Sequence, residues 1–376
     1  MSEVRKRAVR AGQLGRKYVL LILAAALVLA SFSDDHNIDS RLLVHAMGID
    51  ETENGYNVTF QVFRSTGSGS DIPIDISMSN VQLIKVQAKT VTEAVEKCSS
   101  KLGREAFLGH LQVVCFGNGT DYSDPEELFS FAIKDKSVYL GVEICQAENK
   151  AEDIIMKEIK RGTMSSENLV KALKENSQKG RTVECTLLTF LSCIDSPKYT
   201  AMPVISISEQ GEGDNKEPVI DITGTALIAE GETLPQRLNG EQAYGLTLLK
   251  GDAQKFTSVI EKDGREYDVR FENAKTKRRL KLENGRLYYC ADIDLTAALS
   301  LDIKKHSGIT ERELEDHIRR ITLEAWELSE QNGCDAVGVW KYLRQRYPKL
   351  YLENREDLTP IIKSVSPRIT VSCEIE

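Results

Sequence analysis

Apolar and polar positions in the first hundred residues follow the periods of strands and of a helix. Alternating apolar residues predict three strands, over Leu42–Ile49, Tyr56–Arg64 and Val81–Ala88. The Asn54-Gly55 pair between the first two is typical of a hairpin turn. Thr90 with Glu93 three residues later predicts the capped start of a helix that reaches about residue 102.

Shorter segments continue this alternation up to residue 208. The pattern predicts strands over Leu111–Phe116, Val138–Gln146 and Met202–Ser208. It predicts helices over Asp124–Ile133, Ser165–Leu173 and Thr186–Ser192. Strands and helices that alternate in this way indicate a mixed α/β layer. The polar, glycine-rich stretch Glu209–Pro218 then predicts a domain linker or a long loop.

The second half of the chain is richer in strands. Strands are predicted over Val219–Ala229, Phe256–Ile260, Tyr267–Phe271, Arg278–Lys281, Leu287–Leu299 and Ile369–Ile375. Helices are predicted over Asn239–Lys250, over Ala336–Arg346, and from Thr310 to a stop at Gly333. In the last of these, Thr310 and Glu313 form a second capping box, and an apolar stripe follows from Leu314 to Leu328. The expected fold class is α+β, with mixed and antiparallel sheets and packed helices.

The length of 376 residues is too great for one ordinary domain, and 41% apolar residues are enough for packed cores. We expect a signal or anchor over residues 1–32, an N-terminal α/β domain over 33–208 and a C-terminal α+β domain over 209–376. A further division of the last domain near residue 283 stays open.

The first 32 residues have the layout of an export signal. Six basic residues precede the uncharged run Tyr18–Phe32. As a helix this run spans about 22 Å, which is shorter than the roughly 30 Å of a bilayer core. The positive charges hold the N-terminus in the cytoplasm and direct the rest outside. The end of the run approaches the form of a bacterial lipoprotein signal, but Phe32 stands where a cysteine is needed, so no lipid thioether can form. This lipobox-like segment is Leu29, Ala30, Ser31, Phe32. An uncut anchor and a cleaved signal both remain open.

Charge is distributed unevenly between this segment and the rest. The whole chain has a net charge of −8, but residues 1–32 hold six basic residues and one acid, which leaves 43 basic and 56 acidic residues, or −13, for the remainder. An acidic body argues against nucleic acid as a partner. It would also be repelled by an anionic membrane surface, so attachment through the N-terminal segment is expected.

The eight cysteines do not form a recognisable framework. No two are closer than eight residues, and no CxxC pair is present. An even number in an exported chain is compatible with disulfides. Most of them fall on apolar patterns, as in Val142-Glu-Ile-Cys145, so a buried, small apolar role is favoured for each.

The sequence shows no catalytic signature. It lacks a GxSxG elbow, a P-loop, an HExxH helix and an EF-hand loop, so we expect neither an enzyme nor a metal or cofactor site. The five histidines are scattered. His110, in Gly109-His-Leu-Gln112, could be a ligand or a base, and a backbone-bonded histidine at a strand entry is favoured.

Several patches in order along residues 20–376 resemble the Ger(x)C family, the C subunits of spore germinant receptors. The first patches are the lipobox-like segment and Gly48-Ile49-Asp50 at the end of the first strand. The resemblance singles out these further motif residues: Gly109, His110, Leu111, Gln112, Asn239, Gly240, Glu241, Gly245, Gly251, Asp335, Gly338, Tyr347 and Pro348. It defines no catalytic residues, and a structural or interface role is expected for all of them.

The resemblance implies a membrane-associated protein on the extracytoplasmic face of the spore inner membrane. It also implies two partners, an A-type and a B-type membrane subunit, and a complex that responds to small nutrients. Two other functions stay open. An extracytoplasmic solute-binding protein would need two doubly wound lobes, against which residues 256–299 speak. An exported hydrolase is disfavoured by the missing motifs.

Overall fold

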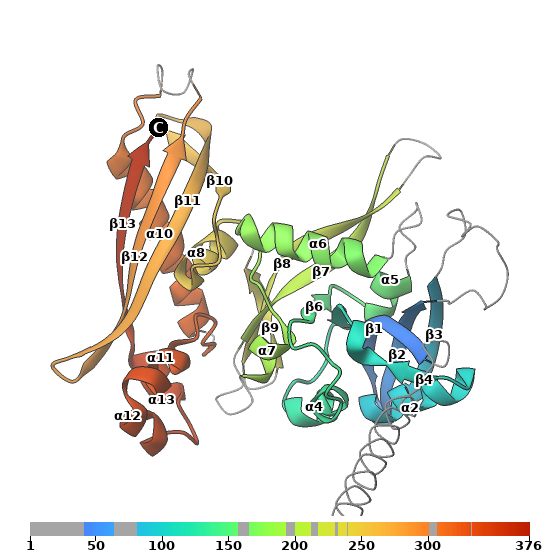
Figure 1. Cartoon of the computed structure of the whole chain (residues 1–376). Helices are drawn as coiled ribbons and strands as arrows, with labels where there is room; N and C mark the ends of the chain where they lie inside the picture. Colours follow the sequence, from blue (N-terminus) through green and yellow to red (C-terminus); the bar gives the residue numbers. More distant parts are fainter. Residues whose placement is uncertain are drawn as a thin grey trace, which may run out of the picture. The chain divides into compact units, whose positions relative to one another are not determined.

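The computed structural model describes residues 41–63, 81–156, 165–192, 200–211, 217–229, 232–238, 240–300, 307–331 and 333–376. The predicted signal or anchor helix of residues 1–32 lies outside them, as does Asn239. The described residues form a mixed α/β, two-domain fold with two sheets and packed helices (Figure 1). Mixed sheets and packed helices are therefore confirmed.

Most of the elements up to residue 238 build one sheet and its covering helices. The strands are β1 (Arg41–Thr52), β2 (Gly55–Phe63), β3 (Val81–Ala88), β4 (Glu105–Phe107), β5 (Val113–Phe116), β6 (Glu143–Ala147), β7 (Thr200–Gln210), β8 (Glu217–Ala229) and β9 (Glu232–Leu238). The helices are α2 (Val91–Leu102), the 3-10 turn η2 (Leu108–His110), α3 (Pro125–Leu128), α4 (Ser130–Lys134), α5 (Ala151–Met156), α6 (Ser165–Gln178) and α7 (Leu187–Leu191).

This sheet has nine described strands and a parallel centre. Its order is β3-β2-β1-β5-β6-β7-β8-β9, and β4 pairs with β1. The run β1, β5, β6, β7 is parallel, whereas the hairpin strands on both sides are antiparallel. Parallel neighbours need long crossovers, and the helices between these strands supply them.

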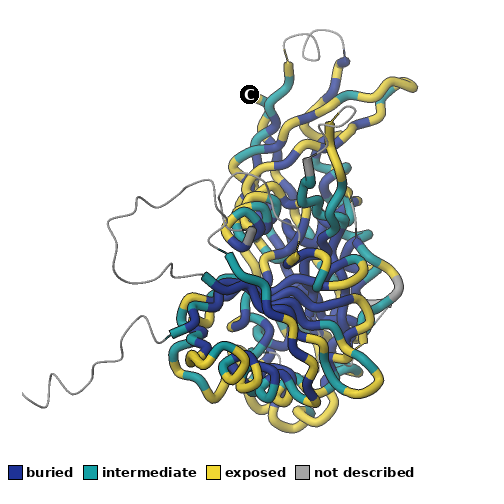
Figure 2. Tube along the Cα trace, turned by 90° about the vertical axis from the view of Figure 1, so that its right-hand side faces the viewer, coloured by how far each residue is buried: buried dark blue, intermediate teal, exposed yellow. Residues whose placement is uncertain are grey.

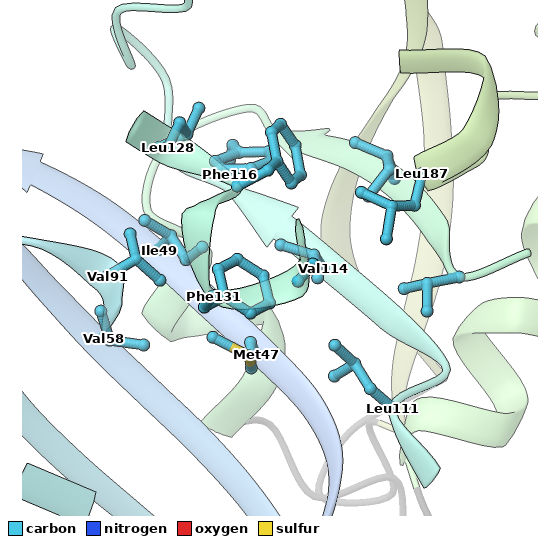
Figure 3. Close-up of a cluster of buried hydrophobic side chains, with 14 of the residues drawn as sticks. Met47, Ile49, Val58, Val91, Leu111, Val114, Phe116, Leu128, Phe131 and Leu187 are labelled. Atoms are coloured by element: carbon cyan, nitrogen blue, oxygen red, sulfur yellow. The ribbon is translucent and has the colours of Figure 1, made fainter. Parts of the chain in front are cut away.

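Both faces of the sheet are buried. Since successive side chains of a strand point to opposite faces, each central strand contributes to two cores. Val114 and Phe116 join a core that includes residues of α2, α3, α4 and α7 (Figure 3). Val113 and Cys115, the intervening residues, join a second core with α5 and α6. The central strands accordingly appear as a dark blue band in Figure 2.

The remaining elements form a second, four-stranded sheet and its helices. They are α8 (Gly240–Lys250), β10 (Phe256–Lys262), β11 (Arg265–Glu283), β12 (Arg286–Ala298), α10 (Glu311–Gln331), α11 (Val339–Arg346), α12 (Pro348–Glu353), α13 (Thr359–Ser364) and β13 (Ser366–Ile375). The strand order is β10-β11-β12-β13, and only β12 and β13 run parallel. The predicted stripe of α10 is confirmed, since Leu314, Ile318 and Ile321 are fully buried against this sheet.

Local signals in the sequence hold in the structure. The Glu93 N–H donates to Thr90 Oγ1 at 3.1 Å, and the Glu313 N–H donates to Thr310 Oγ1 at 3.4 Å, so both predicted caps are present. The hairpin turns Asp263-Gly264 and Asn284-Gly285 have positive φ at both residues, as a type I′ turn requires.

Four predicted segments need correction. The strand predicted over Val138–Gln146 begins only at Glu143, because Tyr139 and Leu140 are apolar residues of an exposed turn. The strands predicted over Tyr267–Phe271 and Arg278–Lys281 are one long strand, β11, with a bulge at which Asn273 takes a φ of 54°. The helix predicted over Asp124–Ile133 is two short helices, α3 and α4.

The stretch Glu209–Pro218, predicted as a domain linker or a long loop, begins in β7 and ends in β8, and residues 212–216 lie outside the described residues. Glu209 pairs with Pro218, and Gln210 pairs with Glu217. Strands β8 and β9 follow residue 209 in the sequence and yet extend the first sheet. Residue 283 lies at the turn between β11 and β12, so a division there would separate two paired strands.

Candidate functional site

A cavity of about 510 Å³ lies where strands β5 and β6 begin. The residues just before each strand line one side of it, and α6 lines the other. The cavity residues of α6 recur at helical spacing, as Glu167, Val170, Lys171, Lys174 and Gln178. The opposite stripe of α6, with Leu169 and Leu173, is buried in the core. The amphipathic pattern of α6 therefore turns a charged stripe toward the cavity.

Glu143 is the buried charged residue of this cavity. Its side chain is 4% exposed, and the Lys174 Nζ lies 3.7 Å from its Oε1. Burial raises the pKa of Glu143 to about 7, against the opposing effect of Lys174. The Glu143 N–H donates to the Gln112 carbonyl at 2.9 Å, so the two cavity residues are adjacent. Glu143 thus changes its charge near neutral pH.

Two residues of the Gly109–Gln112 motif, Leu111 and Gln112, line the cavity, and Gly109 and His110 precede them in the chain. A Cβ on Gly109 would stand 2.4 Å from Cζ of Phe107, so a larger residue would have to displace that ring. The exposed His110 ring packs against Phe107 and His45, with centroids 5.9 and 5.8 Å apart. The backbone bond at this strand entry comes from Gln112, whose N–H donates to the His45 carbonyl at 2.9 Å, and not from the ring of His110.

Gln112 has one polar atom without a partner. Its side-chain Oε1 is buried and accepts no hydrogen bond from the residues that the structure describes. Buried polar atoms in folded proteins nearly always have a partner, so such an atom calls for an explanation.

The Gly48-Ile49-Asp50 patch attaches α5 to the sheet. Asp50 accepts hydrogen bonds from the N–H groups of Ala151 and Glu152, at 2.7 and 2.9 Å, at the start of that helix. A Cβ on Gly48 would stand 3.1 Å from the Ala151 carbonyl carbon and oxygen. The glycine therefore permits the close approach and the aspartate holds it.

The central motif serves a helix crossing. A Cβ on Gly245 of α8 would lie 2.1 Å from the Ile321 carbonyl oxygen of α10 and 3.0 Å from the Ala325 Cβ. Because the nearest atom belongs to backbone, no side-chain rotation relieves the clash. Gly240 begins α8 with a φ of 47°, and Gly251 follows α8 with a φ of 71°. Each of these glycines meets a backbone requirement.

Glu241 belongs to a polar network that sequence reasoning missed. Ser258 donates to Glu241 Oε1 at 2.9 Å and contacts His317 Nε2 at 2.9 Å. Arg320, which can only donate, lies 3.1 Å from His317 Nδ1 and 3.3 Å from Glu241 Oε2. Nδ1 must therefore accept, and the ring proton sits on Nε2, facing Ser258.

This network is not a catalytic triad. In a triad the histidine accepts the serine proton through one nitrogen while a carboxylate holds the N–H of the other. Here the nitrogen facing Ser258 carries the proton, an arginine occupies the other, and Ser258 is 3% exposed. Burial lowers the pKa of His317, which keeps the ring neutral. The network ties α8, β10 and α10 together.

The C-terminal motif contains a helix cap, formed by Asp335, and a brace, formed by the hydrogen bond between Tyr347 and β11. The buried Asp335 carboxylate accepts three backbone N–H groups, from Gly338, Val339 and Trp340, at 2.7 to 2.9 Å. The helix predicted over Ala336–Arg346 therefore begins later, at Val339, after Gly338 in the left-handed conformation.

The brace is Tyr347, which connects the end of α11 to β11. Its hydroxyl accepts the Leu282 N–H at 2.9 Å. Pro348 then opens α12 at a position where its missing N–H costs nothing.

A second cavity, of about 470 Å³, brings the central and C-terminal motifs together. Lys250, beside Gly251, and Gly338 both line it. It contains the half-buried Asp252, whose pKa is raised by desolvation, while the charges of Lys250 and Arg278 oppose that rise. Glu184 also lines this cavity, and its charge raises the pKa of both Asp252 and Glu143. The segment around Glu184 thus lies between the two cavities.

Two family models match the chain. The one described as "Spore germination protein N-terminal domain" matches residues 34–207. The one described as "Spore germination B3/ GerAC like, C-terminal" matches residues 223–376. The chain belongs to this spore germination family. The family is that of the germinant receptor C subunits, so the resemblance drawn from the motifs is confirmed.

This spore germination protein was also compared with solved structures and with curated proteins. A crystal structure of the GerBC protein aligns with 88% of this chain and 96% of its own, at a TM-score of 0.48 and 14% sequence identity. No curated protein matches the chain.

The structure separates the motif residues of this spore germination protein into two groups. Gly109–Gln112 lie beside the larger cavity, whereas the described central and C-terminal motif residues lie in the other half of the fold. The lipobox-like residues 29–32 and Asn239 lie outside the described residues. Glu143 was not predicted, although a carboxylate within the apolar run Val142–Cys145 was a visible signal.

The cysteines of this germination protein behave as buried apolar residues where the structure describes them. Seven of the eight are free and buried, namely Cys98, Cys115, Cys145, Cys185, Cys290, Cys334 and Cys373. Cys193 lies outside the described residues. Within the described ranges no three side chains of the metal-binding types cluster in a way that could hold an ion.

Proposed function

We propose that this chain is a non-enzymatic C subunit of a spore germinant receptor, which supports assembly and nutrient-triggered signalling. The observation that carries the proposal is the pair of family matches, over residues 34–207 and 223–376. They cover both sheets and include every motif residue that the structure describes. The partners are an A-type and a B-type membrane subunit.

The chemistry of the polar clusters supports a role without catalysis. Ser258 is buried and faces the protonated nitrogen of His317, so it has no base. Asp335 is fully occupied by three backbone N–H groups. The hydrogen bonds of these groups are made within the protein, as is usual for structural residues. They leave no lone pair positioned to act as a nucleophile or a base.

Attachment to the spore inner membrane through the N-terminal segment is part of the proposal. Among the helices that the structure describes, none has the length and apolar character to cross a bilayer. The run Tyr18–Phe32 is apolar, and Phe32 cannot be lipidated. We propose that the uncleaved or atypical segment holds the protein at the extracytoplasmic face. Membrane fractionation of wild type and Phe32→Cys tests this, and equal partition of both into the membrane is expected.

The alternative of a solute-binding protein with two doubly wound lobes gains no support from the topology. The described strands form one nine-stranded mixed sheet and one four-stranded sheet built largely from hairpins. Two similar lobes with repeated βα units would give two similar parallel sheets.

Deletion of the gene in a spore-forming host that carries no other gene of this family tests the proposal. Spores without the chain should fail to germinate with the nutrients that trigger the wild type, and complementation should restore germination. The tagged chain should also retain an A-type and a B-type subunit when it is isolated from spore membranes in mild detergent. Unchanged germination of the deletion strain with every nutrient would overturn the proposal.

A further inference from the structure

The larger cavity differs from the rest of the protein in the state of its polar groups. Glu143 is almost completely buried, and among the described residues it forms one ion pair, a long one of 3.7 Å to the largely exposed amine of Lys174. Gln112, which is adjacent to Glu143, has a buried Oε1 that accepts nothing from the residues that the structure describes. Glu143 and Gln112 both line the cavity, so two acceptors lie in the same wall. A ligand in the cavity would require the half-buried Gln112 side chain to rotate its buried oxygen toward it.

We propose that the cavity beside Glu143 binds a small organic molecule through a protonated amine. An ammonium group donates up to three hydrogen bonds and carries the charge that a buried carboxylate needs. Glu143 and the Gln112 oxygen are two acceptors on one side of the cavity, which suits a single ammonium group. A carboxylate or phosphate ligand would place its acceptors against these two acceptors and would be repelled.

The charge of the lining agrees with a cationic ligand. Three carboxylates line the cavity, from Glu143, Glu167 and Glu175, against two amines, from Lys171 and Lys174. With all groups ionised, one negative charge remains for the ligand to balance. The described residues hold no group of three metal-ligating side chains, so an organic cation fits better than a metal ion.

The remaining walls set the size and character of the ligand. About 510 Å³ falls within the range of small-molecule sites. Leu111 and Val170 provide apolar surface, and the Tyr139 ring, on a residue that is 69% exposed, lies over Gly141, 2.2 Å from where a Cβ would be. An aromatic ring at the rim can cover an ammonium group or pack on its alkyl chain. We therefore infer an amine with a short apolar part.

The second cavity serves as an internal contrast. Its acid, Asp252, has the charges of Lys250 and Arg278 beside it, and Lys341 lines the same space. Three cations against Asp252 and Glu184 leave no carboxylate in need of a partner. The inference is therefore confined to the Glu143 cavity, and it does not rest on the proposed function because binding is measured on the isolated chain.

Calorimetric titration of the purified full chain in detergent at pH 8 tests the inference. The probes are n-butylammonium and benzylammonium, with n-butanol and butyrate as controls of the same size without a positive charge. Saturable binding of at least one amine is expected, and none of either control. The variants Glu143→Gln and Gln112→Leu should each weaken amine binding at least tenfold. The matched variant Glu283→Gln, an exposed carboxylate on β11, should bind as the wild type does.

Dependence on pH gives a second reading of the same site. The affinity should rise from pH 6 to pH 8 as Glu143 ionises, because only the carboxylate attracts the amine. The charged groups around Glu143 are Lys174 of α6 and Glu184, with Glu167, Lys171 and Glu175 of α6 in the same cavity. Absence of saturable binding by both amines, or equal binding by wild type and Glu143→Gln, overturns the inference. Either result would leave the proposed receptor role untouched, because germination is measured separately.

Discussion

The Glu143 cavity and the Glu241 network contain similar side chains in opposite states. In the network, each of Glu241, Ser258, His317 and Arg320 has a partner within the group, at distances of 2.9 to 3.4 Å. In the cavity, Glu143 has its nearest cation at 3.7 Å, and Gln112 has an oxygen without a partner. A closed network stabilises the fold, whereas open acceptors beside a cavity can bind something else. A cluster of polar side chains therefore indicates a binding function only when some of its donors or acceptors have no partner within the protein.

The largest effect should come from a matched pair of glycine substitutions. Gly245→Ala places a methyl group 2.1 Å from a backbone oxygen of α10, and we expect a loss of about 3 kcal/mol or more in unfolding free energy. Gly109→Ala meets only the ring of Phe107, which can rotate away, and should cost about 1 kcal/mol or less. Urea unfolding of both variants measures the difference. Equal losses would show that α8 and α10 can separate at little cost.

The next effect concerns the stability of the Glu143 region as a function of pH. Burial raises the folded-state pKa of Glu143 to about 7. The protonated Glu143 therefore contributes its full share to the free energy of unfolding below the unfolded pKa near 4.5, and this share is lost as the pH rises through 7. The loss amounts to about 3 kcal/mol for a shift of this size. Glu143→Gln should abolish this decline and be more stable than wild type at pH 8. Parallel curves for the two proteins between pH 5 and 8 would contradict the assignment.

Asp335→Asn should follow in size. The carboxylate accepts three N–H groups at 2.7 to 2.9 Å in a buried position, and an amide in its place turns a donor toward them. Loss of charge-assisted hydrogen bonds of this kind costs about 2 kcal/mol. Thermal unfolding of the variant, with the exposed Asp316→Asn as control, measures the effect. An unchanged midpoint for Asp335→Asn would show that the cap at α11 contributes nothing.

His317 should titrate with the opposite sign to Glu143. Burial lowers its folded-state pKa, so its contribution is present above the unfolded value near 6.5 and is lost as the pH falls below it. His45, whose pKa is also lowered by burial, acts in the same direction. His317→Gln should therefore reduce the loss of unfolding free energy between pH 6.5 and 5. The dependence of unfolding free energy on pH above 6.5 should stay unchanged. A change confined to pH values above 6.5 would refute the network assignment.

The smallest effect should come from Tyr347→Phe. The hydroxyl accepts one N–H, from Leu282, at a partly exposed site where water can replace it. We expect a loss of about 0.5 to 1 kcal/mol. Urea unfolding beside Tyr342→Phe as a comparison measures it, and a loss as large as that of Asp335→Asn would mean that the brace is more important than its exposure suggests.

Prediction from sequence succeeded where the signal was local. The capped helices at Thr90 and Thr310 and the hairpin at Asn54-Gly55 depend on residues within one turn of each other. It failed where apolar residues are exposed, as at Tyr139 and Leu140, and where the charged face of β11 resembled a break between strands. Four short elements of at most seven residues, β9, α5, α12 and α13, were not predicted.

The candidate site could be predicted only in part, because its residues come from segments that are far apart in the sequence. Gly109–Gln112 were singled out through the family resemblance, but Glu143 and Lys174 reach them from a later strand and a helix, over 30 and 60 residues away in the sequence. A carboxylate inside an apolar strand indicated an unusual position, yet its neighbours depend on the tertiary fold. The role of Gly245 depends in the same way on α10, which follows it by more than 60 residues.

One measurement tests the contrast between the two regions directly. Nutrient-triggered germination is compared in spores whose only copy of the gene carries Glu143→Gln or Ser258→Ala, with equal amounts of the chain confirmed in the spore membrane. The account predicts wild-type germination with Ser258→Ala, because the network is structural, and slower germination with Glu143→Gln, because the cavity binds a ligand. Loss of germination with Ser258→Ala, together with a wild-type response for Glu143→Gln, would contradict it.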